Sequence, residues 1–238
     1  MRKRDDHLRD IFSSRALGDG LIVSDAWYYS PKEFQASWRL KGKDIEIFLS
    51  DYLIDAPDDV IDDFAGALFS IVKKRKPVYG RPFMEWVTSD AFINDKRKIY
   101  MRRSKNLSGS SMGRFREISD SVDRLLDSGL LLPSDIDNSI FTWTSRPNVR
   151  KVGYCSPMMR VVAVSSALDN GSVPENVVDY VVYHESLHLR QGYRPFRRSH
   201  DIQFRNMEKL FPEYGDAEKY LRGLADKIRG DHNNAWER

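Results

Sequence analysis

The chain has 238 residues, of which 41% are hydrophobic and 12% aromatic, so it can form a packed domain and is not disordered throughout. Its single cysteine, Cys155, excludes an internal disulfide and a zinc ribbon built from four cysteines. The net charge of +3 does not by itself indicate a nucleic-acid-binding protein. The start MRKRDDHLRD lacks a signal-like apolar run, and no stretch approaches 18 uninterrupted apolar residues. We therefore expect a cytoplasmic protein with no membrane span.

The N-terminal part is expected to begin with a loosely attached extension over residues 1–30, which are charged and then mixed in character. Two β-leaning runs follow at 34–40 and 44–49, and the turn sequence Lys41-Gly42-Lys43 between them predicts a hairpin. After Pro57, apolar residues recur at three- and four-residue steps, which predicts an amphipathic helix that ends before Pro77.

The middle of the chain shows less regular hydrophobic periodicity. A stretch rich in Ser, Gly and Lys, from Arg102 to Gly113, predicts a loop or linker, and a second amphipathic helix fits residues 115–126. Charge is also unevenly distributed, since an acidic segment at 51–63 precedes a basic stretch at 73–116. These charges suit solvated surfaces, or else a basic face that attracts an acidic partner such as nucleic acid.

The C-terminal part predicts three short strands at 140–145, 151–155 and 159–165, followed by helices. Ser172-Val173-Pro174-Glu175 has the spacing of a capping box and opens an apolar helix, after which two more helices fit 201–211 and 216–228. We expect a single α+β domain over residues 31–238, with its catalytic half at about 138–230. Its mixed, mainly antiparallel sheet would pack on the helix that follows the capping box.

That helix contains the sequence YVVYHESLHLRQ, in which His184 and His188 are four residues apart. Side chains at this spacing lie on one helical face, so both imidazoles can reach one zinc ion at about 2.0–2.1 Å. Glu185 lies between them, close enough to act on a water molecule at the ion without being a ligand. This is the H-E-x-x-H arrangement of zinc hydrolases, in which the glutamate is the general base. The alternative is a pair of core histidines satisfied by their neighbours.

A catalytic zinc site needs a third protein ligand and one open position. His200 is the leading candidate, because it follows a Gly-containing loop and opens a predicted helix. Glu208, on that same predicted helix, is the alternative ligand, or else a partner of the ligands or a solvated residue. The spacing of metzincins is excluded, since their third histidine would fall at Arg194. Five arginines crowd this region and form either a solubilising loop or a basic rim for an acidic substrate: Arg190, Arg194, Arg197, Arg198 and Arg205.

The region from about Ile140 to Leu221 resembles the SprT-like metallopeptidases and the neighbouring YgjP-like group, which are gluzincin-type zinc proteins. The resemblance rests on the segments RVVAVSSALD, VPENVVDYVVYHESLH and HDIQFRNMEKLFPEYGDAEKYL. More loosely, the hairpin and IDAPDDVIDDFAGAL resemble the strand pair and helix that precede the family's catalytic half. The resemblance implies a zincin-like fold, in which His184, His188 and His200 hold Zn²⁺ and Glu185 is catalytic.

Two departures from the family bear on function. Ser186 stands where relatives usually have a larger residue, and the cysteines of the C-terminal zinc ribbon found in some SprT members are missing. The ribbon's absence removes one support for DNA-linked proteolysis. The leading hypothesis is a zinc metallopeptidase that acts on protein or peptide substrates. The alternatives are a zinc-dependent nucleotide or phosphoanhydride hydrolase, and a non-catalytic zinc module that binds protein or nucleic acid.

Overall fold

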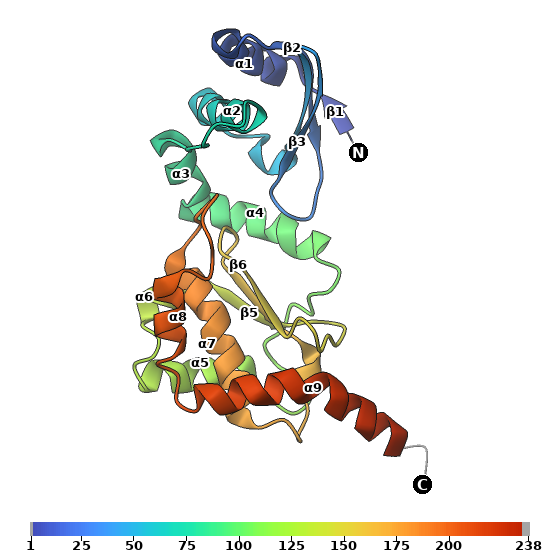
Figure 1. Cartoon of the computed structure of the whole chain (residues 1–238), viewed down its shortest axis with the longest axis vertical. Coiled ribbons are helices and arrows are strands. Elements are labelled where there is room, and N and C mark those ends of the chain that lie inside the picture. The colour runs from blue at the N-terminus through green and yellow to red at the C-terminus, as the bar shows by residue number, and fades with distance from the viewer. Residues whose placement is uncertain (1, 235–238) are drawn as a thin grey trace. The chain divides into compact units, whose positions relative to one another are not determined.

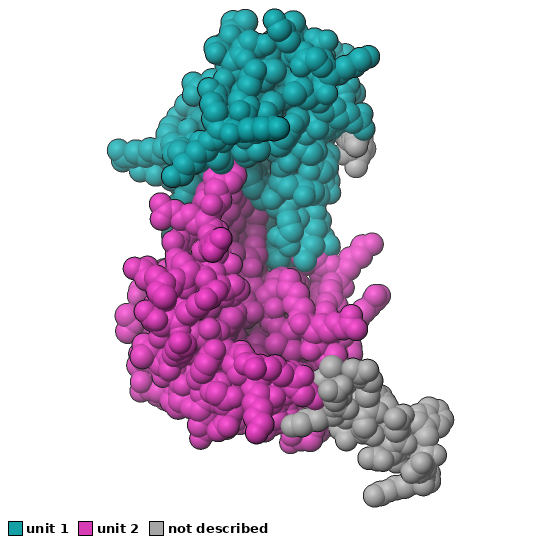
Figure 2. All heavy atoms as spheres, viewed as in Figure 1, with its two compact units in different colours: residues 1–103 teal, residues 104–238 magenta. Residues whose placement is uncertain are grey.

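The structure is a computed structural model that describes residues 2–234, with side chains described for residues 4–224. The chain divides into two compact units, residues 1–103 and 104–238 (Figure 2). This differs from the expected single domain over residues 31–238. Each unit buries apolar side chains of its own and has its own sheet, and the chain leaves the first unit where helix α4 ends. The α+β class is confirmed, and both sheets are mixed.

The sheet of the first unit has the strand order β1-β2-β4-β3. Its strands are β1 (Arg2–Arg4), β2 (Ile22–Tyr29), β3 (Ala36–Lys41) and β4 (Asp44–Ser50). The predicted hairpin is confirmed, because β3 and β4 pair antiparallel in a register that places Lys41 opposite Asp44. Gly42 adopts φ +64° in the turn, a left-handed conformation that glycine tolerates at no steric cost. The β2–β4 pair is parallel.

The N-terminal segment is not the loose extension we expected over residues 1–30. Helix α1 (Asp6–Ala16) is capped by Asp5, whose carboxylate accepts a hydrogen bond from the N–H of Leu8 at 2.8 Å. Leu8, Phe12 and Ala16 are spaced four residues apart and are almost completely buried, because α1 packs against β2 and helix α2 (Figure 1). Strands β1 and β2 flank α1 in sequence, so nearly all of residues 1–30 belong to the packed unit.

Three helices complete the first unit: α2 (Asp58–Val72), α3 (Arg81–Val87) and α4 (Asp90–Arg103). Helix α2 confirms the helix predicted after Pro57. Two short 3₁₀ turns also occur, η1 (Leu17–Asp19) and η2 (Asp51–Leu53). Two residues of the basic stretch at 73–116 form ion pairs within this unit. Lys96 is only 3% exposed and binds Asp55 at 2.6 Å, while Arg103 forms two hydrogen bonds with Asp51 at 2.6 and 2.7 Å.

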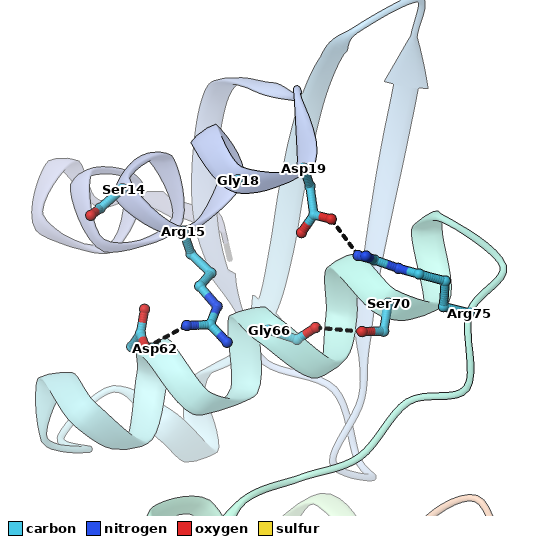
Figure 3. Close-up of a pocket in the computed structure, with 8 residues that line it drawn as sticks. All are labelled: Ser14, Arg15, Gly18, Asp19, Asp62, Gly66, Ser70 and Arg75. Carbon is cyan, nitrogen blue, oxygen red and sulfur yellow. Dashed lines mark hydrogen bonds and ion pairs between the residues drawn. The ribbon is translucent and has the colours of Figure 1, made fainter.

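A polar pocket of about 500 Å³ lies between α1, η1 and α2 (Figure 3). Two ion pairs line it: Arg15 binds Asp62 at 3.4 Å, and Arg75 binds Asp19. The Arg15 guanidinium rests on the α2 backbone at Gly66, where a Cβ atom would lie 2.7 Å from one of its nitrogens. The charges along this pocket are thus compensated in pairs, so it offers a ligand no excess charge.

The sheet of the second unit has the order β5-β7-β6. Its strands are β5 (Ile140–Trp143), β6 (Gly153–Ser156) and β7 (Val161–Val164), which confirms the three predicted strands with somewhat shorter bounds. Strand β7 is completely buried, pairing in parallel with β5 and antiparallel with β6. Helix α7 (Glu175–Gln191) packs across β6 and β7 (Figure 1). The sheet therefore lies against the helix that carries His184, Glu185 and His188.

Helices α5 (Ile118–Asp127), α6 (Pro133–Ile136), α8 (Ile202–Glu208) and α9 (Tyr214–Asn234) also pack against α7, and a 3₁₀ turn, η3 (Ser166–Leu168), follows β7. The capping box predicted at residues 172–175 is wrong. Helix α7 starts after Pro174, and the Ser172 hydroxyl instead donates to the Asn170 side chain at 3.0 Å. Within residues 2–234, no helix combines the length and apolar character needed to cross a bilayer.

Candidate metal centre

Helix α7 is a core helix with one polar face. Eleven of its residues are buried, whereas His184 and His188 are only partly buried and lie one turn apart on the same face. The other faces carry valine, leucine and tyrosine side chains that form the hydrophobic core of the second unit. Packing on several sides thus fixes the helix rigidly and sets the positions of both imidazoles.

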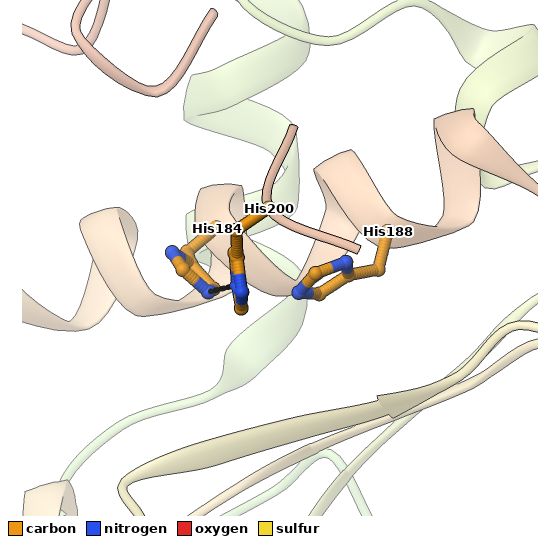
Figure 4. A group of neighbouring side chains, drawn as sticks. All are labelled: His184, His188 and His200. Carbon is orange, nitrogen blue, oxygen red and sulfur yellow. Dashed lines mark hydrogen bonds between the residues drawn. The ribbon is translucent and has the colours of Figure 1, made fainter. Parts of the chain in front are cut away.

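His200 completes a cluster of three histidines (Figure 4). One nitrogen from each ring lies within 4.8 Å of the others, and Nε2 of His200 is 3.2 Å from Nε2 of His184. Two nitrogens bound tetrahedrally to zinc at 2.0–2.1 Å would be about 3.3 Å apart. The cluster could therefore hold a metal ion, and the one pair of nitrogens with a known separation, in His184 and His200, lies at the distance expected of two ligands to one ion.

Phe204 forms the apolar wall of this cluster. Its ring centroid lies 5.0 Å from that of His184, 4.5 Å from that of His188 and 4.7 Å from that of His200. Phe204 is 1% exposed, and its N–H donates to the Asp201 carboxylate that caps α8. The ring of Phe204 therefore packs against all three histidines.

Glu208 contacts one ring nitrogen of His184, and His200 approaches the other. Nδ1 of His184 is 2.6 Å from the Glu208 carboxylate, so Nε2 is the nitrogen that faces the cluster. The Tyr180 hydroxyl is 2.9 Å from the carboxylates of Glu208 and Glu218. A carboxylate on the second ring nitrogen is a common way to orient a metal-binding histidine. The geometry thus favours Glu208 as a partner of His184 rather than as the third ligand.

The electrostatics of the cluster differ from one histidine to the next. Burial, together with the neighbouring His184 and His200, lowers the pKa of His188 to about 4, and burial and His184 also lower the pKa of His200. Burial lowers the pKa of His184 as well, but the hydrogen bond to Glu208 and the charge of Glu185 outweigh it and the net pKa is raised. His188 and His200 are therefore neutral at pH 7, the form that binds metals.

Glu185 is a buried acid beside this cluster. It is 6% exposed, and burial raises its pKa to about 7. Among the described residues, no side chain or backbone group donates a hydrogen bond to its carboxylate. The carboxylate lies against Gly153 of β6, where a Cβ atom would approach its Oε1 to 2.6 Å. Only glycine leaves room here for the Glu185 side chain.

The loop between α7 and α8 brings His200 back to the helix. It starts at Gly192 (φ +68°), and Arg194 then binds Asp201 at 3.0 Å across the loop. Arg190 is tied to Asp135 at 2.5 Å and to the Leu130 carbonyl at 2.9 Å. Two of the five clustered arginines are therefore structural ion-pair partners and not members of a free basic rim.

Comparisons of the chain with protein-family models, with curated proteins and with solved structures found no match. The resemblance to SprT-like proteins therefore stays a prediction. Any functional conclusion depends on the geometry of this site.

The structure brings three of the four predicted site residues, His184, His188 and His200, into one cluster, and Glu185 follows His184 on the same helix. It adds Tyr180, Gly153 and the shared wall at Phe204. Tyr180 lies four residues before His184 on the same helical face, a signal that was available in the sequence. The approach of Gly153 to Glu185 joins positions 32 residues apart, and no local pattern indicates it.

Proposed function

We propose that this chain is a zinc-dependent metallopeptidase with a zincin-like active site, in which His184, His188 and His200 bind Zn²⁺ and Glu185 is the general base. The observation that carries the proposal is Glu185, whose side chain is almost fully buried, receives no hydrogen bond from any described residue, and follows directly after His184 of the three-histidine cluster. Burying an unpaired acid is costly and persists where function requires it.

A zinc ion held by the three histidines would polarise the substrate carbonyl and make a water molecule acidic near neutral pH. Glu185 accepts the proton from the attacking water and delivers it to the nitrogen of the departing amine. Glu208 holds Nδ1 of His184, which keeps Nε2 directed at the cluster. Phe204 covers the cluster and excludes water from that side.

Strand β6 is the better candidate for aligning an extended substrate. Strand β7 cannot do this, because it lies between β5 and β6 and has no open edge. Strand β6 is an outer strand, and its Gly153 touches Glu185. A peptide that pairs with the outer edge of β6 would therefore pass beside the proposed general base.

The test compares purified parent protein with Glu185→Gln and His188→Ala variants. Zinc content is measured by mass spectrometry, and hydrolysis is measured on casein, on a mixed peptide library and on nucleoside triphosphates. We expect about one zinc per chain in the parent and in Glu185→Gln, loss of zinc in His188→Ala, and peptide cleavage by the parent alone.

Other outcomes separate the alternatives. Nucleotide cleavage without peptide cleavage would replace the peptidase with a phosphoanhydride hydrolase. Zinc binding with no hydrolysis of any substrate would leave a non-catalytic zinc module. A parent protein that binds no zinc after reconstitution would refute the metal site itself.

A further inference from the structure

A second pocket, of about 310 Å³, lies behind the histidine cluster between the C-terminal part of α7, the following loop and α8. Leu187, Phe204 and Met207 form the apolar part of its lining, and Gln191, Gln203 and three arginines form the polar part. Phe204 is shared, since it lines this pocket and also stacks on His188. The volume is at the lower end of the range for ligand pockets, about 300–1,000 Å³, which suits a group of a few carbon atoms.

Three arginines line the same pocket, and they are not equivalent. Arg190 is bound to Asp135 at 2.5 Å and its side chain also approaches the Met207 sulfur at 4.0 Å. Arg194 is bound to Asp201 at 3.0 Å. Arg197 is exposed at the rim of the pocket, and no carboxylate of the described residues pairs with it. One guanidinium is thus left without a counter-charge.

We propose that this pocket is a binding site for a carboxylate carried on a short apolar group. The apolar group would occupy the space between Leu187, Phe204 and Met207, and the carboxylate would bind Arg197. Arginine suits this task because its planar donors match both oxygens of a carboxylate. Two sources share this chemistry: a small free acid, or the C-terminal residue of a peptide. The proposal does not depend on the peptidase activity.

The test measures binding by isothermal titration calorimetry to the full chain as purified, in 0.15 M salt. The probes are 4-methylpentanoate and N-acetyl-leucine, and their uncharged counterparts are 4-methylpentanamide and N-acetyl-leucinamide. The variant is Arg197→Gln. The matched control is Arg198→Gln, which removes the adjacent exposed arginine that does not line the pocket.

We expect both acids to bind saturably and neither amide to bind. Arg197→Gln should weaken binding of the acids by about tenfold or more, and Arg198→Gln should leave it within about twofold. If N-acetyl-leucine binds much more tightly than 4-methylpentanoate, the ligand is the end of a peptide; if not, it is a free acid. Absence of saturable binding, equal binding of acids and amides, or equal losses in the two variants would each overturn the proposal.

Discussion

The contact between Glu208 and His184 gives the most direct test of the metal centre. The Glu208 carboxylate is 2.6 Å from Nδ1 of His184 and its side chain is only 12% exposed, so the hydrogen bond is charge-assisted and shielded from water. Partners of this kind contribute about ten- to hundredfold to metal affinity, or about 1.4–2.7 kcal/mol. Glu208→Gln keeps the shape but loses the charge, so we expect zinc affinity to fall about tenfold. Glu208→Ala removes the acceptor, and we expect a loss of about a hundredfold.

Zinc affinity would be measured by competition with a chromophoric chelator at pH 7. Glu218→Gln is the matched control, because Glu218 contacts the Tyr180 hydroxyl but not His184, and we expect its zinc affinity to stay within about threefold of the parent. Parent-like affinity in Glu208→Ala, or an equal loss in Glu218→Gln, would refute the positioning role. If Glu208 were itself the third ligand, Glu208→Ala would lose as much affinity as His188→Ala, while His200→Ala would lose little.

Three further predictions test the surroundings of the site and the two cores. Gly153→Ala places a Cβ atom 2.6 Å from Glu185 Oε1, so we expect a loss of about 1–3 kcal/mol in the free energy of unfolding, measured in urea, with zinc binding retained. Asp169→Ala removes the acceptor of three backbone N–H groups at residues 114–116, at 2.5, 2.9 and 3.1 Å, and should cost about 1–2 kcal/mol in the same assay. Burial alone would raise the pKa of Asp51, but the hydrogen bonds with Arg103 lower it by more than burial raises it. The pKa of Asp51 in the folded protein therefore lies below its ordinary value. The stability difference between the parent and Asp51→Asn should therefore be full at pH 7 and shrink as the pH falls below about 4; a difference that is constant with pH would contradict this.

Elements with uninterrupted local patterns could be predicted from the sequence, and those with mixed patterns could not. Helix α2 follows from its apolar spacing, and the β3–β4 hairpin follows from its turn. The buried apolar residues of helix α1 are also spaced four residues apart, but the many charged residues between them make this pattern hard to recognise. In α4, the buried Lys96 interrupts the apolar face, and its charge is compensated by the neighbouring Asp95 and by the distant Asp55. The division into two units depends on which helices and strands pack together. A local sequence pattern does not contain that information.

The candidate site shows the same limit. The spacing of His184 and His188 predicts two ligands on one face, because helical geometry alone brings them together. The sequence favours His200 over Glu208 as the third ligand, but it does not show how either one approaches the pair. In the structure they approach different ring nitrogens of His184: Nε2 for His200 and Nδ1 for Glu208.

Helix α7 also contains its own comparison between an acid that is paired within the fold and the acid that we propose to be the general base. Asp179 and Glu185 are both buried, but Asp179 forms two hydrogen bonds with Arg124, at 2.7 and 2.8 Å, whereas no described residue donates to Glu185. Removing the negative charge should therefore have opposite effects at the two positions. Asp179→Asn should lower the free energy of unfolding by about 1–2 kcal/mol, since Arg124 is partly exposed and water replaces some of the interaction. Glu185→Gln should leave the metal-free protein as stable as the parent or more stable, because it relieves the burial of a charge. Urea unfolding at pH 8 measures both, and a Glu185→Gln variant that loses as much stability as Asp179→Asn would show that Glu185 serves the core rather than chemistry.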